Sequence, residues 1–155
     1  MKLNSLVVIA MMSAVIEVNA AGVDSAVGAV PADPVLQIAN AAIAKKDWIA
    51  AQTALKKALE GNANNADYHN LYAFSLRKAP NPDMKQVFLH YEQALRIDPR
   101  HRGAHEYIGE AYLMVDDLGK AREHLAVLDK LCFLPCEEYT DLKEAVAKYQ
   151  RNHPG

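Results

Sequence analysis

The chain has 155 residues, which is enough for one domain of ordinary size. Apolar residues make up 51% of it and charged residues 23%, and the formal net charge is −2. These values are typical of a globular protein, and the charge balance argues against a nucleic-acid-binding or acidic-membrane-binding protein. Alanine is abundant and β-branched runs are few after residue 30, which favours helices throughout.

The N-terminus has the layout of a secretory signal peptide. Lys2 provides a positive start, residues 6–15 form an apolar segment too short to span a bilayer, and Val18 and Ala20 are the small residues that precede a cleavage site. We expect cleavage near Ala20 and a bacterial protein that is periplasmic or secreted, with an uncleaved anchor as the alternative. Residues 21–34 contain Gly and Pro without a helical period and predict a flexible leader.

From Val35 onward, apolar side chains recur every three or four residues, which predicts seven helices. Turn and helix-breaking residues separate these helices at Asp47, 62–65, 79–82, 98–99, 116–117 and 131–135. Asn81 is expected to be the N-cap of the fourth helix and Pro82 its first residue. The last predicted helix spans residues 136–150.

Small residues suited to helix–helix contacts repeat along the chain. On the first helix of each pair they are Ala39, Ala73 and Gly109, separated by 34 and 36 residues. On the second helix they are Ala51, Val87 and Ala121, separated by 36 and 34 residues. A two-residue insertion in the segment 79–82 reconciles both series with one period of 34. Because glycine in mid-helix costs about 1 kcal/mol relative to alanine, Gly109 is expected to allow a close approach to Ala121.

Residues 33–131 resemble three tetratricopeptide (TPR) repeats, at about 33–65, 66–101 and 102–131. Residues 136–150 resemble the helix that usually closes such arrays. The third repeat matches the small–aromatic–alanine–large pattern of the family through Gly109, Tyr112, Ala121 and Leu125, and the second ends in ALRIDP. Two departures are Ala63, where the family usually has proline, and Val87 in the second repeat.

The resemblance implies an all-α solenoid of three helical hairpins plus a C-terminal capping helix, in a domain that spans residues 35–150. The first helices of the hairpins would line a concave groove that binds an extended peptide or a partner helix. By the same resemblance, the groove residues are Asn40, Asn70, Phe74, Arg77, Glu106 and Glu110. The alternative is that these are solvated polar residues on an exposed face.

The sequence does not support one binding mode that is known within the family. Chaperone-binding TPR domains hold a C-terminal carboxylate with Lys, Asn and Arg at set groove positions. Those positions are occupied here by Leu36, Asn40, Leu71, Gly103 and Tyr107, and only Asn40 matches. A carboxylate clamp is therefore not expected.

Cys132 and Cys136 are the only cysteines of the chain, and they lie between the last repeat and the closing helix. In an oxidising compartment two nearby cysteines commonly form a disulfide, and we expect a structural one that holds the closing helix in place. A thiol near a helix N-terminus is also more reactive. The alternative function is therefore a thiol-redox or metal-handling accessory protein that uses these two cysteines.

No supported catalytic or metal-binding set stands out. His101 and His105 are four residues apart but lack the glutamate of an HExxH motif, and Glu106 with Glu110 is a common exposed pair. We therefore expect a non-enzymatic adaptor or scaffold in the cell envelope, without a cofactor. Its expected partner is another protein or peptide, with no nucleic acid and no membrane contact beyond export.

Overall fold

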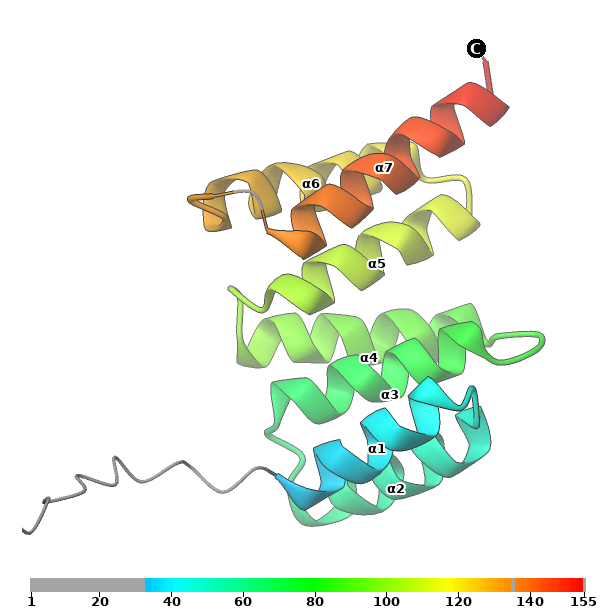
Figure 1. Cartoon of the computed structure of the whole chain (residues 1–155), viewed down its shortest axis with the longest axis vertical. Helices are drawn as coiled ribbons and strands as arrows, with labels where there is room; N and C mark the ends of the chain where they lie inside the picture. Colours follow the sequence, from blue (N-terminus) through cyan, green and yellow to red (C-terminus); the bar gives the residue numbers. More distant parts are fainter. Residues whose placement is uncertain (1–32, 135, 155) are drawn as a thin grey trace, which may run out of the picture. The chain divides into compact units, whose positions relative to one another are not determined.

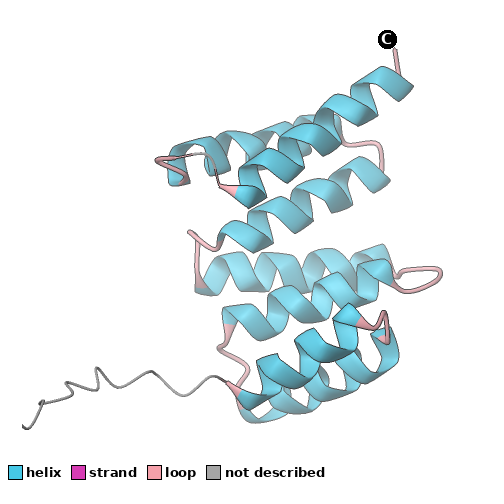
Figure 2. Ribbon diagram, in the orientation of Figure 1, coloured by secondary structure: helices cyan, strands magenta, loops and turns pink. Residues whose placement is uncertain are grey.

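The computed structural model describes residues 33–134 and 136–154. The expected signal peptide, residues 1–20, and nearly all of the expected leader lie outside these residues. The described chain consists of helices and loops without strands, and none of its helices is long and apolar enough to cross a membrane (Figure 2). In chain order the helices are α1 (Pro34–Ala44), α2 (Trp48–Gly61), α3 (Ala66–Lys78), α4 (Met84–Ile97), α5 (Arg102–Met114), α6 (Leu118–Leu131) and α7 (Glu137–Asn152).

The helices pair as the sequence predicts. α1 packs on α2, α3 on α4 and α5 on α6, and α7 packs on both α5 and α6 (Figure 1). The first helices of the hairpins also contact one another in order, α1 with α3, α3 with α5 and α5 with α7. The predicted solenoid of three hairpins and a closing helix is thereby confirmed. We call the surface formed by α1, α3, α5 and α7 the odd-helix face.

The turns inside the hairpins confirm the inferred insertion. Three residues, 45–47, join α1 to α2, and three, 115–117, join α5 to α6. Lys46 and Asp116 take the same left-handed conformation at the middle of these turns, with φ of 58° and 61°. The loop between α3 and α4 has five residues, 79–83. Its two additional residues account for the shift between the two series of small residues.

The prediction that Asn81 and Pro82 begin the fourth helix is wrong. α4 begins at Met84, and the Asp83 carboxylate caps it by accepting hydrogen bonds from the backbone N–H groups of Lys85 and Gln86. Asn81 instead has φ of 51°, a left-handed conformation that asparagine tolerates better than most residues. The longer loop therefore turns at Asn81, and the helix starts at the next strong N-cap residue.

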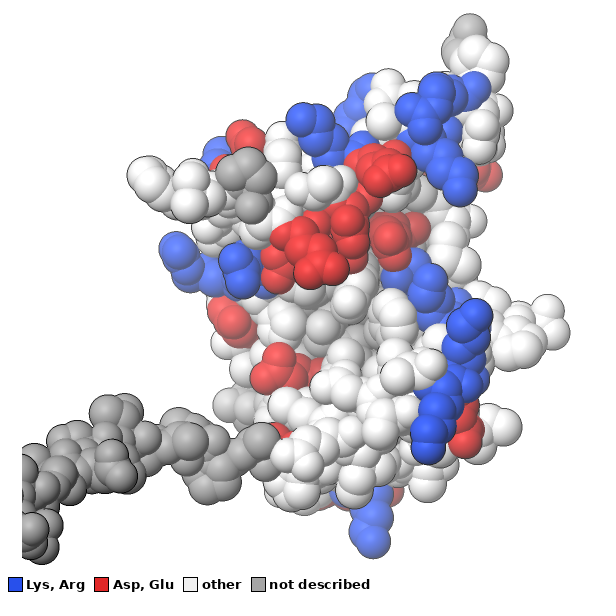
Figure 3. Space-filling model, viewed as in Figure 1, with Lys and Arg blue, Asp and Glu red and all other residues white. Residues whose placement is uncertain are grey.

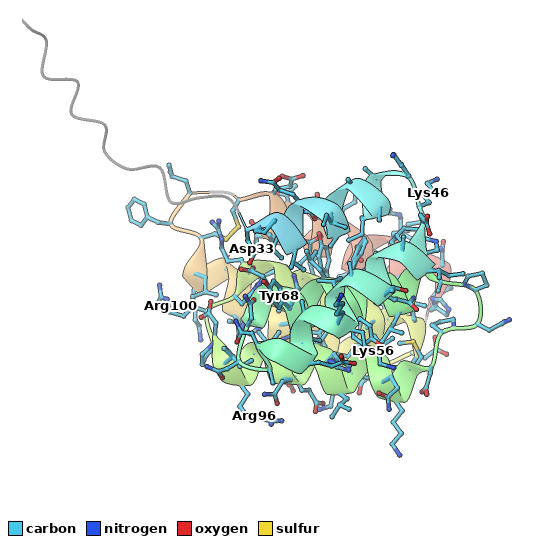
Figure 4. The ribbon with its side chains drawn as sticks, turned by 90° about the horizontal axis from the view of Figure 1, so that it is seen from below. Asp33, Lys46, Lys56, Tyr68, Arg96 and Arg100 are labelled. Atoms are coloured by element: carbon cyan, nitrogen blue, oxygen red, sulfur yellow. A yellow bond between two sulfur atoms is a disulfide. The ribbon has the colours of Figure 1, made fainter. Side chains whose placement is uncertain are left out.

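The leader ends earlier than predicted, because α1 begins at Pro34. The Asp33 carboxylate caps the helix by accepting from the N–H groups of Val35 and Leu36, and proline suits the first helical position. The Tyr68 hydroxyl of α3 donates a hydrogen bond of 2.6 Å to the same carboxylate (Figure 4). This bond lowers the pKa of Asp33, and it ties the start of the first hairpin to the second.

The residues that set the repeat period form the core. Ala39, Ala51, Ala73, Val87 and Ala121 are all fully buried. The middle cluster joins α3, α4 and α5 through Ala73, Tyr91 and Ile108, and the C-terminal cluster joins α6 and α7 through Leu128 and Leu142. Packing between neighbouring hairpins thus makes the stack continuous, as a solenoid requires.

Gly109 serves the contact between α5 and α7. A side chain at this position would place its Cβ 2.6 and 2.8 Å from the two terminal methyl carbons of Leu142. The sequence predicted a close approach to Ala121 of the adjacent helix, whereas the nearest side-chain atoms are those of the closing helix. The absence of a side chain at Gly109 lets Leu142 become fully buried.

The expected disulfide is present between Cys132 and Cys136, whose Cα atoms are 5.8 Å apart. Cys132 is the C-cap of α6 and Cys136 the N-cap of α7, so the bridge links the end of one helix to the start of the next. Phe133 and Leu134 project into solvent between them. The disulfide therefore holds the N-terminus of α7 close to the last hairpin.

Candidate functional site

The six residues expected to line a groove come from α1, α3 and α5. The structure brings Arg77 together with Glu110, and Asn70 together with Glu106, on the odd-helix face. Phe74 lies beside Arg77, whereas Asn40 is exposed on α1 and takes part in none of these contacts. Asn70, Arg77 and Glu106 are almost completely buried, so they are not the solvated polar residues of the alternative interpretation.

Arg77 is held by its neighbours on all sides. Its guanidinium pairs with the Glu110 carboxylate at 2.5 Å and donates from Nε to the Tyr91 hydroxyl at 3.3 Å. The guanidinium carbon lies 5.6 and 5.8 Å from the ring centroids of Phe74 and Tyr107, within the range of cation–π contacts. With its charge compensated and only 4% of its side chain exposed, Arg77 supports the packing of α3 on α5.

Asn70 and Glu106 open into a pocket of about 230 Å³ between α3, α5 and α7. We call it the acidic pocket; its lining residues are Asn70, Leu71, Gly103, Glu106, Tyr107, Glu137, Glu138 and Asp141. Four of the eight are carboxylates, and acidic side chains gather over α5 and α7 in Figure 3. Three of the lining residues occupy positions that form the carboxylate clamp in chaperone-binding TPR domains. These residues are Leu71, Gly103 and Tyr107.

Glu106 is the innermost carboxylate of the pocket. It is 7% exposed and forms no hydrogen bond or ion pair with other described residues. Burial raises the pKa of its carboxyl to about 8, and the nearby carboxylates of Glu110 and Asp141 add to the shift. The pKa of the Tyr107 hydroxyl is raised to about 12, first by burial and then by the charge of Glu106. Near neutral pH the Glu106 carboxyl therefore keeps its proton for most of the time, and the charge at the pocket comes from the carboxylates of Glu137, Glu138 and Asp141.

Asn70 contributes a buried acceptor with no partner. The residue is 5% exposed, and its Oδ1 atom has no hydrogen-bond donor among the described residues. A Cβ atom added at Gly103 would lie 3.4 Å from the Asn70 Nδ2 atom. This is close to an ordinary van der Waals contact, so Gly103 borders the Asn70 amide at the edge of the acidic pocket.

A second pocket with different charge lies at the other end of the same helices. It measures about 400 Å³ and includes Lys78 of α3 and Lys148 of α7, together with Tyr149 and His153. In Figure 3, Lys and Arg side chains lie to one side of the acidic patch. The odd-helix face thus changes from acidic near the start of α7 to basic near its end.

Sequence reasoning missed the contribution of the closing helix. Glu137, Glu138 and Asp141 were not assigned to the site, because residues 136–150 were expected only to cover the last hairpin. Tyr107 was considered only as a clamp position and rejected. One signal in the sequence was the run of acidic residues at the start of α7, with Glu137 and Asp141 spaced to share a helix face.

The structure offers little for metal or thiol chemistry. Within residues 33–134 and 136–154, no three His, Cys, Asp or Glu side chains converge in a way that could hold a metal ion. The disulfide uses both sulfur atoms, so neither cysteine presents a thiolate in this state. The arrangement of carboxylates, amide and aromatic ring in the acidic pocket is suited to binding a cationic group.

Comparison with known proteins shows the fold. No protein-family model matches the sequence, and no curated protein matches it. Among solved structures, the chain is similar to the TPR2B domain of yeast Sti1 in its complex with pHsp70, with a TM-score of 0.67 and 16% sequence identity. The match covers 77% of this chain and 95% of that domain. The seven described helices therefore have the fold of a tetratricopeptide-repeat domain.

Proposed function

We propose that this tetratricopeptide-repeat fold is a non-enzymatic protein-interaction module that binds a peptide or a helix of another protein on its odd-helix face. The observation that carries the proposal is the buried Asn70 Oδ1 atom, which has no hydrogen-bond donor among the described residues and shares a pocket on this face with the largely buried Glu106 carboxyl. Buried polar groups are normally hydrogen-bonded, so a ligand that satisfies both would bind favourably. The complex of the Sti1 domain is a precedent for partner binding by this fold.

The proposed location is the bacterial cell envelope or the medium outside the cell. Support comes from the apolar N-terminal segment, residues 6–15, and the small residues Val18 and Ala20 that follow it. The disulfide between Cys132 and Cys136 is a second support, because such bridges persist in oxidising compartments. In that location the module would act as an adaptor or scaffold for another envelope protein.

Site-specific photocrosslinking in the native compartment tests the proposal. A photoreactive amino acid at Asn40 or Glu144 samples the odd-helix face, and one at Lys56 or Arg96 samples α2 and α4 (Figure 4). All four positions are exposed, so substitution there leaves the core intact. We expect one partner to crosslink from Asn40 and Glu144 only, and a peptide of the crosslinked segment to compete. Crosslinks formed only from Lys56 and Arg96 would move the binding surface to the second helices.

A further inference from the structure

We propose that the acidic pocket holds the ammonium or guanidinium group of a lysine or arginine side chain that projects from the bound partner segment. This inference rests on the proposed function and specifies its chemistry. The pocket of about 230 Å³ is below the ~300–1,000 Å³ of typical small-molecule sites. Its size suits one side chain better than a whole small ligand.

The charge of the pocket exceeds what the fold requires. Glu137 and Glu138 lie in the first turn of α7, where acidic residues favourably meet the helix dipole. That explanation does not apply to Glu106, which lies inside α5, or to Asp141, which lies beyond the first turn of α7. The folded chain therefore gathers carboxylates here without a structural reason within its own helices.

The described chain supplies little compensating charge. Arg102 reaches the outer edge, where its Nε atom is 3.5 Å from a carboxylate oxygen of Glu138, and half of its side chain remains exposed. Arg77 is committed to Glu110 and Tyr91. Glu106 has no ion pair with a cationic side chain among the described residues, so a cation entering from outside would favour the ionised form of its carboxyl and complete the site.

Asn70 provides independent support for a donor-bearing ligand. Its unpartnered Oδ1 atom is an acceptor, and ammonium and guanidinium groups carry only donors. A group that binds the Glu106 carboxylate and the Asn70 amide oxygen together would satisfy both buried groups. A halide or carboxylate ligand offers no donor to the Asn70 amide oxygen.

The other walls of the pocket match the stem of a long basic side chain. Leu71 is apolar, and Tyr107 provides an aromatic ring beside the carboxylates. Lysine and arginine bury their methylene groups against such surfaces while the charged head meets the carboxylates. A bare metal ion fits less well, since the described carboxylates do not converge as metal ligands.

The test follows the binding of small probe molecules by NMR. It uses the protein in the form that its producing cell makes after processing. The probes are N-acetyl-lysinamide and N-acetyl-argininamide, with N-acetyl-norleucinamide as the neutral probe of similar shape. We expect saturable shifts of the backbone amides of Gly103, Glu106 and Tyr107 with the two cationic probes only. Equal shifts with the norleucine probe, or no saturable shift with either cation, would overturn the proposal.

Two variants connect binding to the buried groups. Glu106→Gln keeps the shape of the side chain and should weaken cation binding at least ten-fold, and Asn70→Leu should weaken it without a change in net charge. Glu144→Gln removes an exposed carboxylate of α7 outside the pocket and is the matched control, with unchanged affinity expected. Equal losses in Glu106→Gln and Glu144→Gln would show general electrostatic attraction and contradict the proposal.

The probe experiment and the crosslinking experiment test different proposals, and their results distinguish the two. Crosslinks confined to the odd-helix face, together with no probe binding, would leave the interaction module intact and refute only the basic side chain. Probe binding at the pocket, together with crosslinks confined to α2 and α4, would refute the proposed binding face.

Discussion

The Nδ1 atoms of His105 and His124 lie 2.9 Å apart and connect the two helices of the third hairpin. His69 and His90 form the same contact in the second hairpin, at 2.8 Å. In each pair the α3 or α5 histidine also points Nε2 at a backbone carbonyl, that of Ala63 or Pro99. A carbonyl only accepts, so Nε2 donates, and in a neutral ring the Nδ1 atom then accepts from the Nδ1–H group of the partner histidine. With both rings neutral, each pair has one fixed arrangement of tautomers, whereas two protonated rings would place two N–H donors against each other.

The histidine pairs predict a loss of stability in mild acid. Burial, with the adjacent histidine, lowers the pKa of His90 and of His124 to about 4. Below about pH 6.5 the unfolded chain takes up protons that the folded chain does not bind. The free energy of unfolding therefore decreases as the pH is lowered from about 6.5 to about 4. We expect the melting temperature to decrease steadily over this window, as measured by circular dichroism.

A double variant identifies the cause. His90→Gln with His124→Gln removes the two most strongly shifted histidines, and its melting temperature should depend less on pH between 4 and 6.5. His153→Gln is the control, because His153 is exposed beyond the end of α7. An unchanged pH dependence in the double variant would rule out the histidine pairs as the source.

Glu106 predicts that stability falls as the pH rises, whereas the histidine pairs predict that it falls as the pH is lowered. Its pKa is raised to about 8, so the folded chain keeps a proton that the unfolded chain has lost above about pH 4.5. Stability from this group is therefore complete below pH 4.5 and is lost as the pH rises through 8. Glu106→Gln should stabilise the protein at pH 9 by about 1–3 kcal/mol, since it removes a buried unpaired charge. Chemical denaturation at pH 5 and pH 9 measures the difference, and an equal effect at both values would refute the assignment.

Gly109 predicts a steric limit between α5 and α7. Gly109→Leu would drive its side chain into Leu142, whose methyl carbons lie 2.6 and 2.8 Å from the Cβ position, and should destabilise the fold by about 1–3 kcal/mol. Gly61→Ala is the control, because no atom lies within 4 Å of its Cβ position and alanine favours helices. Adding Leu142→Ala to Gly109→Leu should recover part of the loss. Equal melting temperatures for Gly109→Leu and the parent would contradict the packing.

The disulfide predicts the absence of free thiols. Thiol titration of protein from an oxidising compartment should detect no free thiol. Two titratable thiols would contradict the disulfide. The closed loop is short, so Cys132→Ser with Cys136→Ser should lower stability by only about 1–2 kcal/mol. The loss in the free energy of cation binding should exceed this loss in the free energy of unfolding. The reason is that the bridge holds the end of α7 that supplies Glu137 and Asp141.

Arg77 predicts a stability effect where the sequence suggested a purely functional one. Because Arg77 is buried and paired, its removal leaves the Glu110 charge and the Tyr91 hydroxyl without their partner. We expect a loss of about 3–5 kcal/mol. Phe74→Ala alone is the better probe of binding, and a melting temperature unchanged by Arg77→Ala would contradict the buried pair.

Local signals in the sequence were sufficient for most of the fold. The period of 34, the insertion between Ala73 and Val87, and the breaks at Asp47 and Asp117 all depend on residues whose backbone preferences act over one turn. Asn81 and Asp83 show the limit of such signals. Both residues are good N-caps, and only the path of the longer loop selected Asp83.

The candidate site depended on contacts that sequence spacing does not report. Asn70, Glu106 and Asp141 belong to three helices, and their distance depends on how α7 sits on α5. Arg77 and Glu110 are 33 residues apart, and nothing in either local pattern shows that one neutralises the other. The expected groove residues lie on α1, α3 and α5, and the burial of three of them, Asn70, Arg77 and Glu106, was not predicted.

The sequence by itself determined a repeating, all-helical chain with a bridged pair of cysteines, because helix propensity, capping and periodic burial are local properties. Only the tertiary structure decided that Leu142 occupies the space at Gly109, and that the closing helix thereby brings its carboxylates to Glu106. Electrostatic potential and burial depend on the distances between side chains from different helices. Those distances are set by packing, which the order of residues along one helix does not specify.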